Sequence, residues 1–579
     1  MLPILHFSGK FRFSMPGYNN DPRRVGVAFD PDKPREEVLA LCRCDPSRYF
    51  ELDVEAVAHQ VSDGGGAPHI TGDPLLGLPV RLSGHFPDVS PSAVCSQLHA
   101  GRLSVGGSAL VAGVRKACQS VVRLNVRSEG FSDETVAGHL DALVDVSSRR
   151  QGPTGSRFFS ELADADVLRL HLHLNRYNGV DASPPEEPLT GDVFGYLCPV
   201  ERQVDAEVAP PRRRKLVAHP GLPDQGWAFD TYLAAPPPPR PYPPHWIDIE
   251  GFYEVVADGR ALAVHYLDFV PYLDRQRTTP PVDHYVVRWQ SPTTTVELGE
   301  FSGTHEEMAR TAGVVVLALP PEVDTSDGGE LEVHVVRGGQ TVPLVVETAW
   351  DLVLEGDRGF ALASAGAATI SARVYHRNRP VPGHPVHLVG EAANRKSPVV
   401  ARFTREEAVT DESGRVQVTV QASDLTAMGD VADPVTGGAA GSLAWDRYYG
   451  NFLYLKIDNP LRRNPWRQDA TEVVELAVRV LHKVEPAEIP AQPSFERDVK
   501  PLFAYQVRYF PWLHVREVAG RYVRLFDLED LEDMRSLAPQ VVSRLTLPDH
   551  DPLKMPRSRD FPVGGAAVVQ RWIDTGMHP

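Results

Sequence analysis

Two histidines at alternate positions are the residues whose type and spacing most directly suggest chemistry. His171 and His173 lie in residues 169–174, where every second residue is a leucine. In an extended strand, side chains two residues apart project from the same face, so the two imidazoles share one face. Neutral imidazole is a common ligand of transition metals. The pair could bind a metal ion if a third ligand came from elsewhere; the alternative is a polar outer face of a strand.

The better-known enzyme motifs are absent from the sequence. It contains no G-x-G-x-x-G opening a helix, no Walker A loop, no H-E-x-x-H and no G-x-S-x-G, the patterns that mark nucleotide, metal or nucleophile chemistry. His384 and His387 have a tempting spacing but no carboxylate or cysteine nearby. The cysteines are odd in number and form no C-x-x-C, which favours inert thiols in a reducing compartment. They are Cys42, Cys44, Cys95, Cys118 and Cys198.

Length and composition describe a large protein without nucleic-acid or membrane-spanning features. The chain has 579 residues, of which 42% are hydrophobic and 23% charged, and its net charge is −17. The length allows about three to five domains. The negative charge disfavours general nucleic-acid binding, which needs a basic face. No apolar run approaches about 18 residues, and the first residues lack the pattern of a signal peptide. We therefore expect a cytoplasmic protein without membrane contact.

Most of the elements that must position these residues are short strands. Alternating apolar and polar residues, separated by Pro, Gly and Asn, predict strands through most of the chain. The prolines of 234–245 fix φ and remove amide donors, so this run predicts an extended linker. We predict a multidomain, mainly β protein with β-sandwich or barrel-like domains, including an immunoglobulin-like sandwich, and a small α-helical C-terminal domain. The predicted divisions are 1–233 (β-rich), 234–245 (linker), 246–347 (β-rich), 348–485 (immunoglobulin-like sandwich) and 495–579 (helical).

The C-terminal segment carries a second candidate site. It begins with FERDVKPLF at 495–503, contains Met555-Pro556 and has QRWIDTG at 570–576. This layout resembles the small c-type cytochrome domains, in which a C-x-x-C-H motif attaches haem and a methionine supplies an axial ligand. The corresponding positions 507–511 read VRYFP, so no thioether can form. The resemblance leaves His514 and Met555 as candidate ligands of a non-covalent haem.

The same segment could keep a cytochrome-c-like helical fold without any cofactor. Its apolar residues are numerous enough for a small core, which side chains alone would then have to fill. In that case we expect Tyr509 and Phe510 to turn inward into part of the volume of the missing haem, because aromatic rings fill such a volume well. Met555 would then pack as an ordinary hydrophobic residue.

A further resemblance extends over nearly the whole chain. Residues 5–9 (LHFSG), 81–86 (RLSGHF), 164–168 (DADVL) and 553–559 (LKMPRSR) resemble, in the same order, stretches of the violacein-pathway imine-dimer synthase and the chromopyrrolate synthases. Those enzymes couple oxidised aromatic amino acids, and the chromopyrrolate synthases are regarded as haem-containing. The resemblance covers only their amino-terminal half. Their other half is a ferritin-like four-helix bundle whose carboxylates and E-x-x-H motifs bind metal, and this sequence contains no E-x-x-H.

The family resemblance implies a subunit of an oxidative enzyme complex. It would act on an aromatic, tryptophan-derived (indolic) amino-acid substrate, with a non-covalent haem in or next to this chain. The alternative is a non-catalytic scaffold or interaction subunit for a separately encoded catalytic protein, which the missing enzyme motifs favour. Both hypotheses expect a second protein subunit as partner, and neither assigns a catalytic residue from the sequence.

Overall fold

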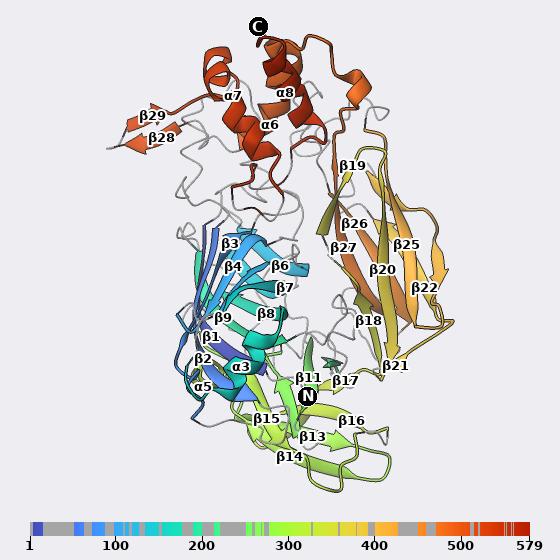
Figure 1. Cartoon of the computed structure of the whole chain (residues 1–579). Helices are drawn as coiled ribbons and strands as arrows, with labels where there is room; N and C mark the ends of the chain where they lie inside the picture. Colours follow the sequence, from blue (N-terminus) through green and yellow to red (C-terminus); the bar gives the residue numbers. More distant parts are fainter. Residues whose placement is uncertain are drawn as a thin grey trace.

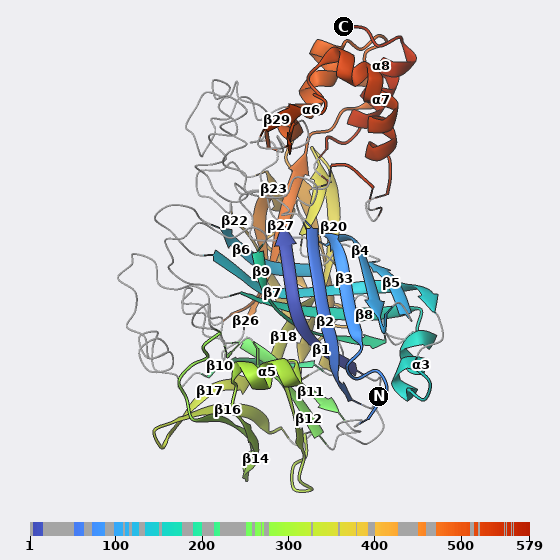
Figure 2. The ribbon, with the colours of Figure 1, turned by 90° about the vertical axis from the view of Figure 1, so that its left-hand side faces the viewer.

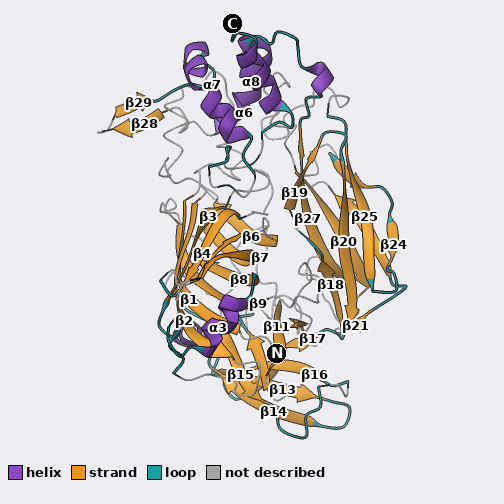
Figure 3. Ribbon diagram, in the orientation of Figure 1, coloured by secondary structure: helices purple, strands orange, loops and turns teal. Residues whose placement is uncertain are grey.

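The structure is a computed structural model in which strands build most of the described part of the chain (Figure 3). Four of its sheets contain five or more strands, and the helices are concentrated at the C-terminal end. The residues that the structure describes are 4–14, 51–62, 72–86, 98–107, 110–114, 119–126, 134–149, 153–176, 189–199, 213–219, 250–256, 261–267, 269–270, 277–325, 328–356, 359–377, 379–391, 400–425, 450–458, 471–509, 515–518, 521–548, 551, 553–556, 559 and 561–579.

The first sheet closes on itself. Its strand order is β5-β4-β3-β2-β1-β9-β8-β7-β6, and β5 also pairs with β7, so the path returns to its start. β5 pairs with residues 144–149 of β7 and β6 with residues 134–141, so β5 and β6 follow each other along one edge. Figure 2 shows β1, β2 and β3 side by side in this closed sheet. Its strands are β1 (Ile4–Ser14), β2 (Glu51–Ser62), β3 (Pro79–His85), β4 (His99–Val105), β5 (Leu110–Val114), β6 (Gln119–Val126), β7 (Glu134–Arg149), β8 (Val167–Arg176) and β9 (Leu189–Pro199).

Alternation along the strands fills the interior of the closed sheet with apolar side chains. Leu5, Phe7, Phe11 and Phe13 of β1 point into one buried core, together with the leucines of β8. Helix α3 (Arg157–Asp164) adds Phe159 and Leu162 to the same core. Because neighbouring side chains on a strand point to opposite faces, this arrangement sends the polar residues of β1 and β8 to the outer face.

The second sheet covers part of that outer face. Its order is β14-β13-β16-β17-β10-β11-β12-β15, and Phe194 of β9 packs into its core. Helix α5 (His305–Thr311) lies against β1 (Figure 2), where the Ser8 hydroxyl donates to the carbonyl of Ala309 at 2.6 Å. The strands are β10 (Arg213–Ala218), β11 (Glu250–Val256), β12 (Ala261–His265), β13 (His284–Gln290), β14 (Thr295–Phe301), β15 (Val314–Ala318), β16 (Glu330–Arg337) and β17 (Gln340–Glu347).

The third unit is a sandwich of two five-stranded sheets with one shared core. One sheet has the order β18-β20-β25-β23, with β21 paired to β20, and the other has the order β19-β27-β26-β22-β24. β19 runs parallel to β27, whereas the other pairs are antiparallel. The strands are β18 (Trp350–Leu354), β19 (Gly359–Ala363), β20 (Ala367–His376), β21 (Arg379–Pro380), β22 (Pro385–Glu391), β23 (Ala401–Phe403), β24 (Glu407–Val409), β25 (Arg415–Ala422), β26 (Gly450–Asp458) and β27 (Thr471–Leu481).

A small helical unit follows the sandwich and contains the C-terminus (Figure 1). A short 3-10 turn, η4 (Pro486–Glu488), precedes a π-helical turn, η5 (Phe495–Val499), which continues into α6 (Lys500–Tyr509). The remaining elements are the hairpin β28 (Val515–Val518) and β29 (Arg521–Arg524), and the helices α7 (Leu531–Leu545) and α8 (Gly565–Asp574). None of the described helices is both long and apolar enough to cross a lipid bilayer.

Side chains fill the core of this helical unit. Phe495, Val507, Met534 and Trp572 are all buried in one cluster. Val507 is the first of the five positions that correspond to a haem-attachment motif, and there it serves as a core residue. Trp572 joins the two ends of the unit, because its ring lies 5.6 Å from the Phe495 ring and its Nε1 donates to the carbonyl of His578 at 2.7 Å. The structure describes neither Phe510 nor the side chain of Tyr509. The prediction that these two rings turn inward therefore lies outside the described residues.

The second sheet draws strands from both sides of the predicted linker. Residues 234–245 lie outside the described residues, but β10 precedes them and pairs with β11 and β17, which follow them. β10 thus belongs to the second sheet although it precedes residues 234–245, so a domain boundary at 234–245 does not separate the first sheet from the second. The sandwich strands run from Trp350 to Leu481 and the helical unit from Phe495 onward.

We expect Trp572→Ala to destabilise the helical unit by about 3–5 kcal/mol, since it removes a fully buried aromatic ring. Trp572→Phe should cost less because only the hydrogen bond and part of the ring are lost. Hydrogen exchange resolved by peptide should show faster exchange in α6, α7 and α8, and unchanged exchange in the sandwich. Arg571→Ala, on the exposed face of the same helix, is the control. Equal protection in Trp572→Ala and the control would contradict this packing.

Candidate functional site

Four histidines and a tyrosine gather where the outer face of the closed sheet meets the second sheet. We call His6, His171, His173, Tyr196 and His265 the imidazole–tyrosine cluster. The register explains the first part of it, because His6 of β1 and His171 of β8 each lie opposite Tyr196 of β9. His173 follows on the same face of β8, two residues along.

The second sheet completes the cluster with aromatic rings. His265 of β12 stacks on Phe252 of β11, with ring centroids 4.0 Å apart. His171 stacks on Tyr196 at 4.9 Å, and His6 lies 5.9 Å from His265. The rings therefore form a continuous contact from one sheet to the other.

The side chains of the cluster are largely buried. All four histidines and Tyr196 are buried, and they line a cavity of about 10 Å³ together with residues of both sheets. A cavity of this size holds about one water molecule. The site as it stands has room for a water or a proton but not for an organic substrate.

The predicted metal site at His171 and His173 gains no third ligand in this arrangement. Among the described residues, no three His, Cys, Asp or Glu side chains are placed to hold a metal ion. The two imidazoles do share one face, but the second sheet covers that face, so it is not the solvent-facing side of a strand. His6, Tyr196 and His265 were not predicted from the sequence. Apolar and polar residues alternate over 5–13, and this pattern could have placed His6 on the polar face of a strand.

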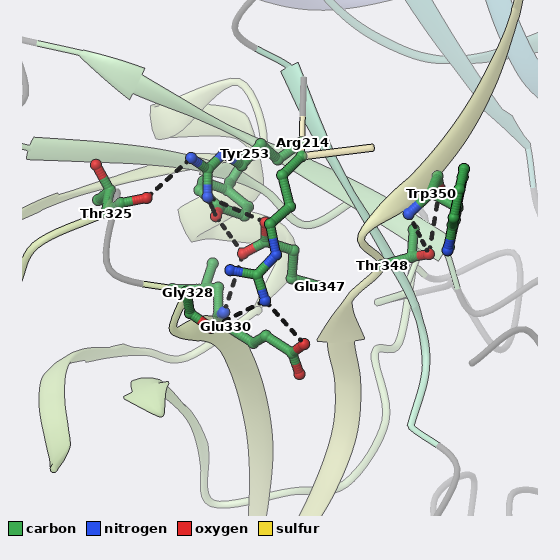
Figure 4. Close-up of polar contacts among 10 residues, drawn as sticks. Arg214, Tyr253, Thr325, Gly328, Glu330, Glu347, Thr348 and Trp350 are labelled. Atoms are coloured by element: carbon green, nitrogen blue, oxygen red, sulfur yellow. Dashed lines mark hydrogen bonds and ion pairs between the residues drawn. The ribbon is translucent and has the colours of Figure 1, made fainter. Parts of the chain in front are cut away.

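A second polar centre lies inside the second sheet (Figure 4). Glu347 of β17 accepts a hydrogen bond from the Tyr253 hydroxyl at 2.5 Å. It also forms an ion pair with Arg214, at 3.1 Å. Arg214 also donates to the carbonyl of Thr325 at 3.0 Å. Burial, and then the charge of Glu347, raises the pKa of Tyr253 well above its usual value, so the hydroxyl stays protonated and donates. The buried carboxylate is thus fully compensated by two strands of its own sheet.

Polar contacts of the same kind join the second sheet to the sandwich. Arg377, which follows β20, donates to the carbonyl of Gly328 at 2.9 Å and lies 3.6 Å from Glu330. Lys215 of β10 forms an ion pair with Glu472 of β27, which is almost completely buried. Removing one partner of a buried pair leaves an uncompensated charge, so these contacts hold the two units in one arrangement.

Glu332 of β16 lies between two histidines. Its carboxylate is 2.8 Å from His334 Nε2 and 3.7 Å from His219 Nε2. Hydrogen bonds with His219 and His334 lower the pKa of Glu332 to about 2. The group is therefore a carboxylate at neutral pH, and the two imidazoles are its stabilising partners.

Only one of the two candidate haem ligands, Met555, lies among the described residues. His514 lies outside the described residues. Met555 is half-buried, and its backbone N–H donates to the carbonyl of Arg544 at 3.1 Å. It is not among the residues that form the core around Trp572.

Comparisons with known proteins identify no family for this chain. It matches no protein-family model and no curated protein. Among solved structures, the D0-D1 domain of Intimin is 12% identical, with 37% of this chain and 89% of that chain covered and a TM-score of 0.14. Domains 4 and 5 of the S-layer protein SbsC are 11% identical, covering 47% and 98%, with a TM-score of 0.12. A Salmonella alpha-2-macroglobulin is 10% identical, covering 85% and 38%, with a TM-score of 0.14. These similarities are too low to carry an argument.

We expect His265→Ala to weaken the contact between the two sheets by about 2–3 kcal/mol, because it removes a buried ring and leaves a cavity. His265→Phe keeps a ring over Phe252 and should retain most of the stability. Urea unfolding combined with hydrogen exchange in β11 and β12 measures the loss. The control is His284→Ala, at a partly exposed histidine on β13. If His265→Ala proves as stable as this control, the cluster does not hold the sheets together.

We expect Glu332→Gln to lower stability at pH 7 by about 1 kcal/mol, since the contacts of Glu332 with His219 and His334 are partly exposed and screened by solvent. The pKa of Glu332 is lower in the folded state than its ordinary 4.5, so its contribution is present above about pH 4.5 and is lost as the pH falls toward about 2. Urea unfolding of both proteins between pH 7 and pH 3 should therefore show the difference shrinking on acidification. A constant difference would show that the charge of Glu332 is not responsible. Glu297→Gln, at an exposed glutamate of β14, should have little effect at any pH.

Proposed function

We propose that this chain is a non-catalytic scaffold subunit that holds a separately encoded catalytic protein. The observation that supports this most directly is the state of its buried carboxylates. Glu347 is compensated by Tyr253 and Arg214, and Glu355 by Arg373 and Arg415. Paired charges of this kind hold strands and domains in place, whereas a catalytic carboxylate needs access to a substrate.

The proposal implies a catalytic partner. This partner and the scaffold would together form an oxidative enzyme complex that acts on an aromatic, tryptophan-derived amino acid. This part rests on the sequence resemblance to the amino-terminal half of the imine-dimer and chromopyrrolate synthases. The scaffold would work in the cytoplasm. Its catalytic residues would lie in the partner.

The finer fold assignments belong to the same proposal. The sandwich would be of the immunoglobulin type, because sheets with the orders β18-β20-β25-β23 and β27-β26-β22 match the pattern in which three or four strands of each sheet face one another. The helical unit would be a cytochrome-c-like domain that has lost its haem attachment, supported by the packing of its first and last helical turns through Phe495 and Trp572.

The test is turnover and absorbance of the isolated chain. We expect no oxidation of L-tryptophan by hydrogen peroxide or oxygen, with or without added haemin or iron(II), and no Soret band in the purified protein. Activity should appear only when the catalytic subunit is added. Turnover by the isolated chain, abolished in a His171→Ala/His173→Ala variant, would overturn the scaffold proposal. A Soret band with equimolar iron that disappears in Met555→Ala would favour the haem-binding alternative.

A further inference from the structure

A buried carboxylate at the edge of the interface between the first two sheets is surrounded by basic side chains. Asp192 of β9 is almost fully buried and lies opposite Lys10 of β1 in the register. Its Oδ1 forms an ion pair with Lys10, and its Oδ2 is 2.6 Å from Arg277 Nε and 3.9 Å from His305 Nδ1. Arg277 and His305 come from the part of the chain that contributes the second sheet, so the group spans both units.

Arg277 meets the carboxylate through Nε of its guanidinium, 2.6 Å from Asp192 Oδ2. The two terminal Nη groups lie at the far end of the same planar group from the chain. The paired N–H groups at the end of an arginine match the two oxygens of a carboxylate or phosphate. The side chain is 39% exposed, so this end is open to solvent.

The backbone at Arg277 is also unusual. Its φ is 65°, in the left-handed region that residues with a side chain seldom adopt. Such a conformation costs of order 1–3 kcal/mol and persists where surrounding structure holds it, frequently at ligand sites. Here it fixes the direction from which the guanidinium approaches Asp192.

The four interacting side chains carry a net positive charge, although the whole chain is acidic. Lys10 and Arg277 contribute +2 and Asp192 contributes −1, which leaves +1 with His305 neutral and +2 with it protonated. Lys10 is 53% exposed and His305 is 33% exposed. An anion can therefore approach the three basic groups from solvent while Asp192 stays behind them.

We propose that Lys10, Arg277 and His305 form a binding site for an oxyanion, the carboxylate or phosphate group of a small molecule. Asp192 is the positioning residue, which aligns the Arg277 fork toward the ligand. The site lies on the surface next to α5 and is independent of the scaffold function proposed above.

Binding at this site should strengthen as the pH falls. Burial lowers the pKa of His305, and the charge of Asp192 opposes this shift, while Arg277 and Lys10 reinforce it. The pKa of His305 therefore lies below its ordinary 6.5, so the ring is mostly neutral at pH 7.5. The proton that it gains as the pH falls through this lowered pKa adds a third positive charge. The other charged groups on the adjoining elements are Arg12 of β1, Asp53, Glu55 and His59 of β2, and Glu306, Glu307 and Arg310 of α5.

Isothermal titration of the full chain tests the site with three probes: inorganic phosphate, acetate and sulfate. We expect saturable binding in the wild-type protein and at least tenfold weaker binding in Arg277→Gln. The ratio of phosphate to acetate affinity identifies which oxyanion the site prefers. The matched control is Arg288→Gln on β13, whose arginine lies 3.6 Å from Glu297; it should bind like the wild type.

Sulfate supplies the second readout, because its charge does not change between pH 7.5 and pH 5.0. Wild-type affinity should rise by roughly twofold or more over this range, and His305→Gln should abolish the rise. This variant decides the question if Arg277→Gln fails to fold. No saturable binding of any probe, wild-type binding by Arg277→Gln, or an unchanged pH effect in His305→Gln would overturn the proposal.

Discussion

The structure depends on burying a polar surface between two sheets. The outer face of β1, β9 and β8 carries imidazoles, a phenol and a carboxylate, yet the second sheet covers it. Burying polar groups is unfavourable unless they find partners. Here the rings stack, as His265 does on Phe252 at 4.0 Å, and the carboxylate of Asp192 meets Lys10 and Arg277. The contact therefore specifies one relative placement of the sheets, because only that placement matches these groups.

The same principle operates further along the chain. Glu347, Glu355 and Glu472 are buried carboxylates, each paired with a cation from another strand or another unit. Replacement of such pairs by hydrophobic residues is often neutral for stability. Their value is geometric, since a charge that must find its partner excludes alternative ways of packing one unit on the next. A protein that holds another protein in place needs this kind of fixed internal geometry.

Much of the architecture was predictable from local sequence, but the site was not. The alternation of residues 169–174 correctly placed His171 and His173 on one face of a strand, because period-two patterns report directly on strands. The mainly β character follows from the same kind of local signal, whereas the helical C-terminal segment was predicted from its resemblance to c-type cytochrome domains.

Sequence alone could not show what lies opposite that face. His6 and His265 are 259 positions apart in the numbering, and only the folded register brings them within 5.9 Å. The reading of His171 and His173 as a polar outer face of a strand left open what covers that face. In the same way, the prolines of 234–245 suggested a division between domains, although β10 before them pairs with β11 and β17 after them.

The pairing of β10 with β11 and β17 matters when the chain is cut within 234–245. A fragment beginning after the prolines would lack β10, the strand that lies between β17 and β11. The backbone N–H and C=O groups of those two strands would then lose their partners in the middle of the sheet and form two open edges. Unprotected strand edges recruit strands from other molecules. A cleavage in 234–245 that leaves both pieces associated would be tolerated, whereas loss of the amino-terminal piece would convert the remainder into material that aggregates.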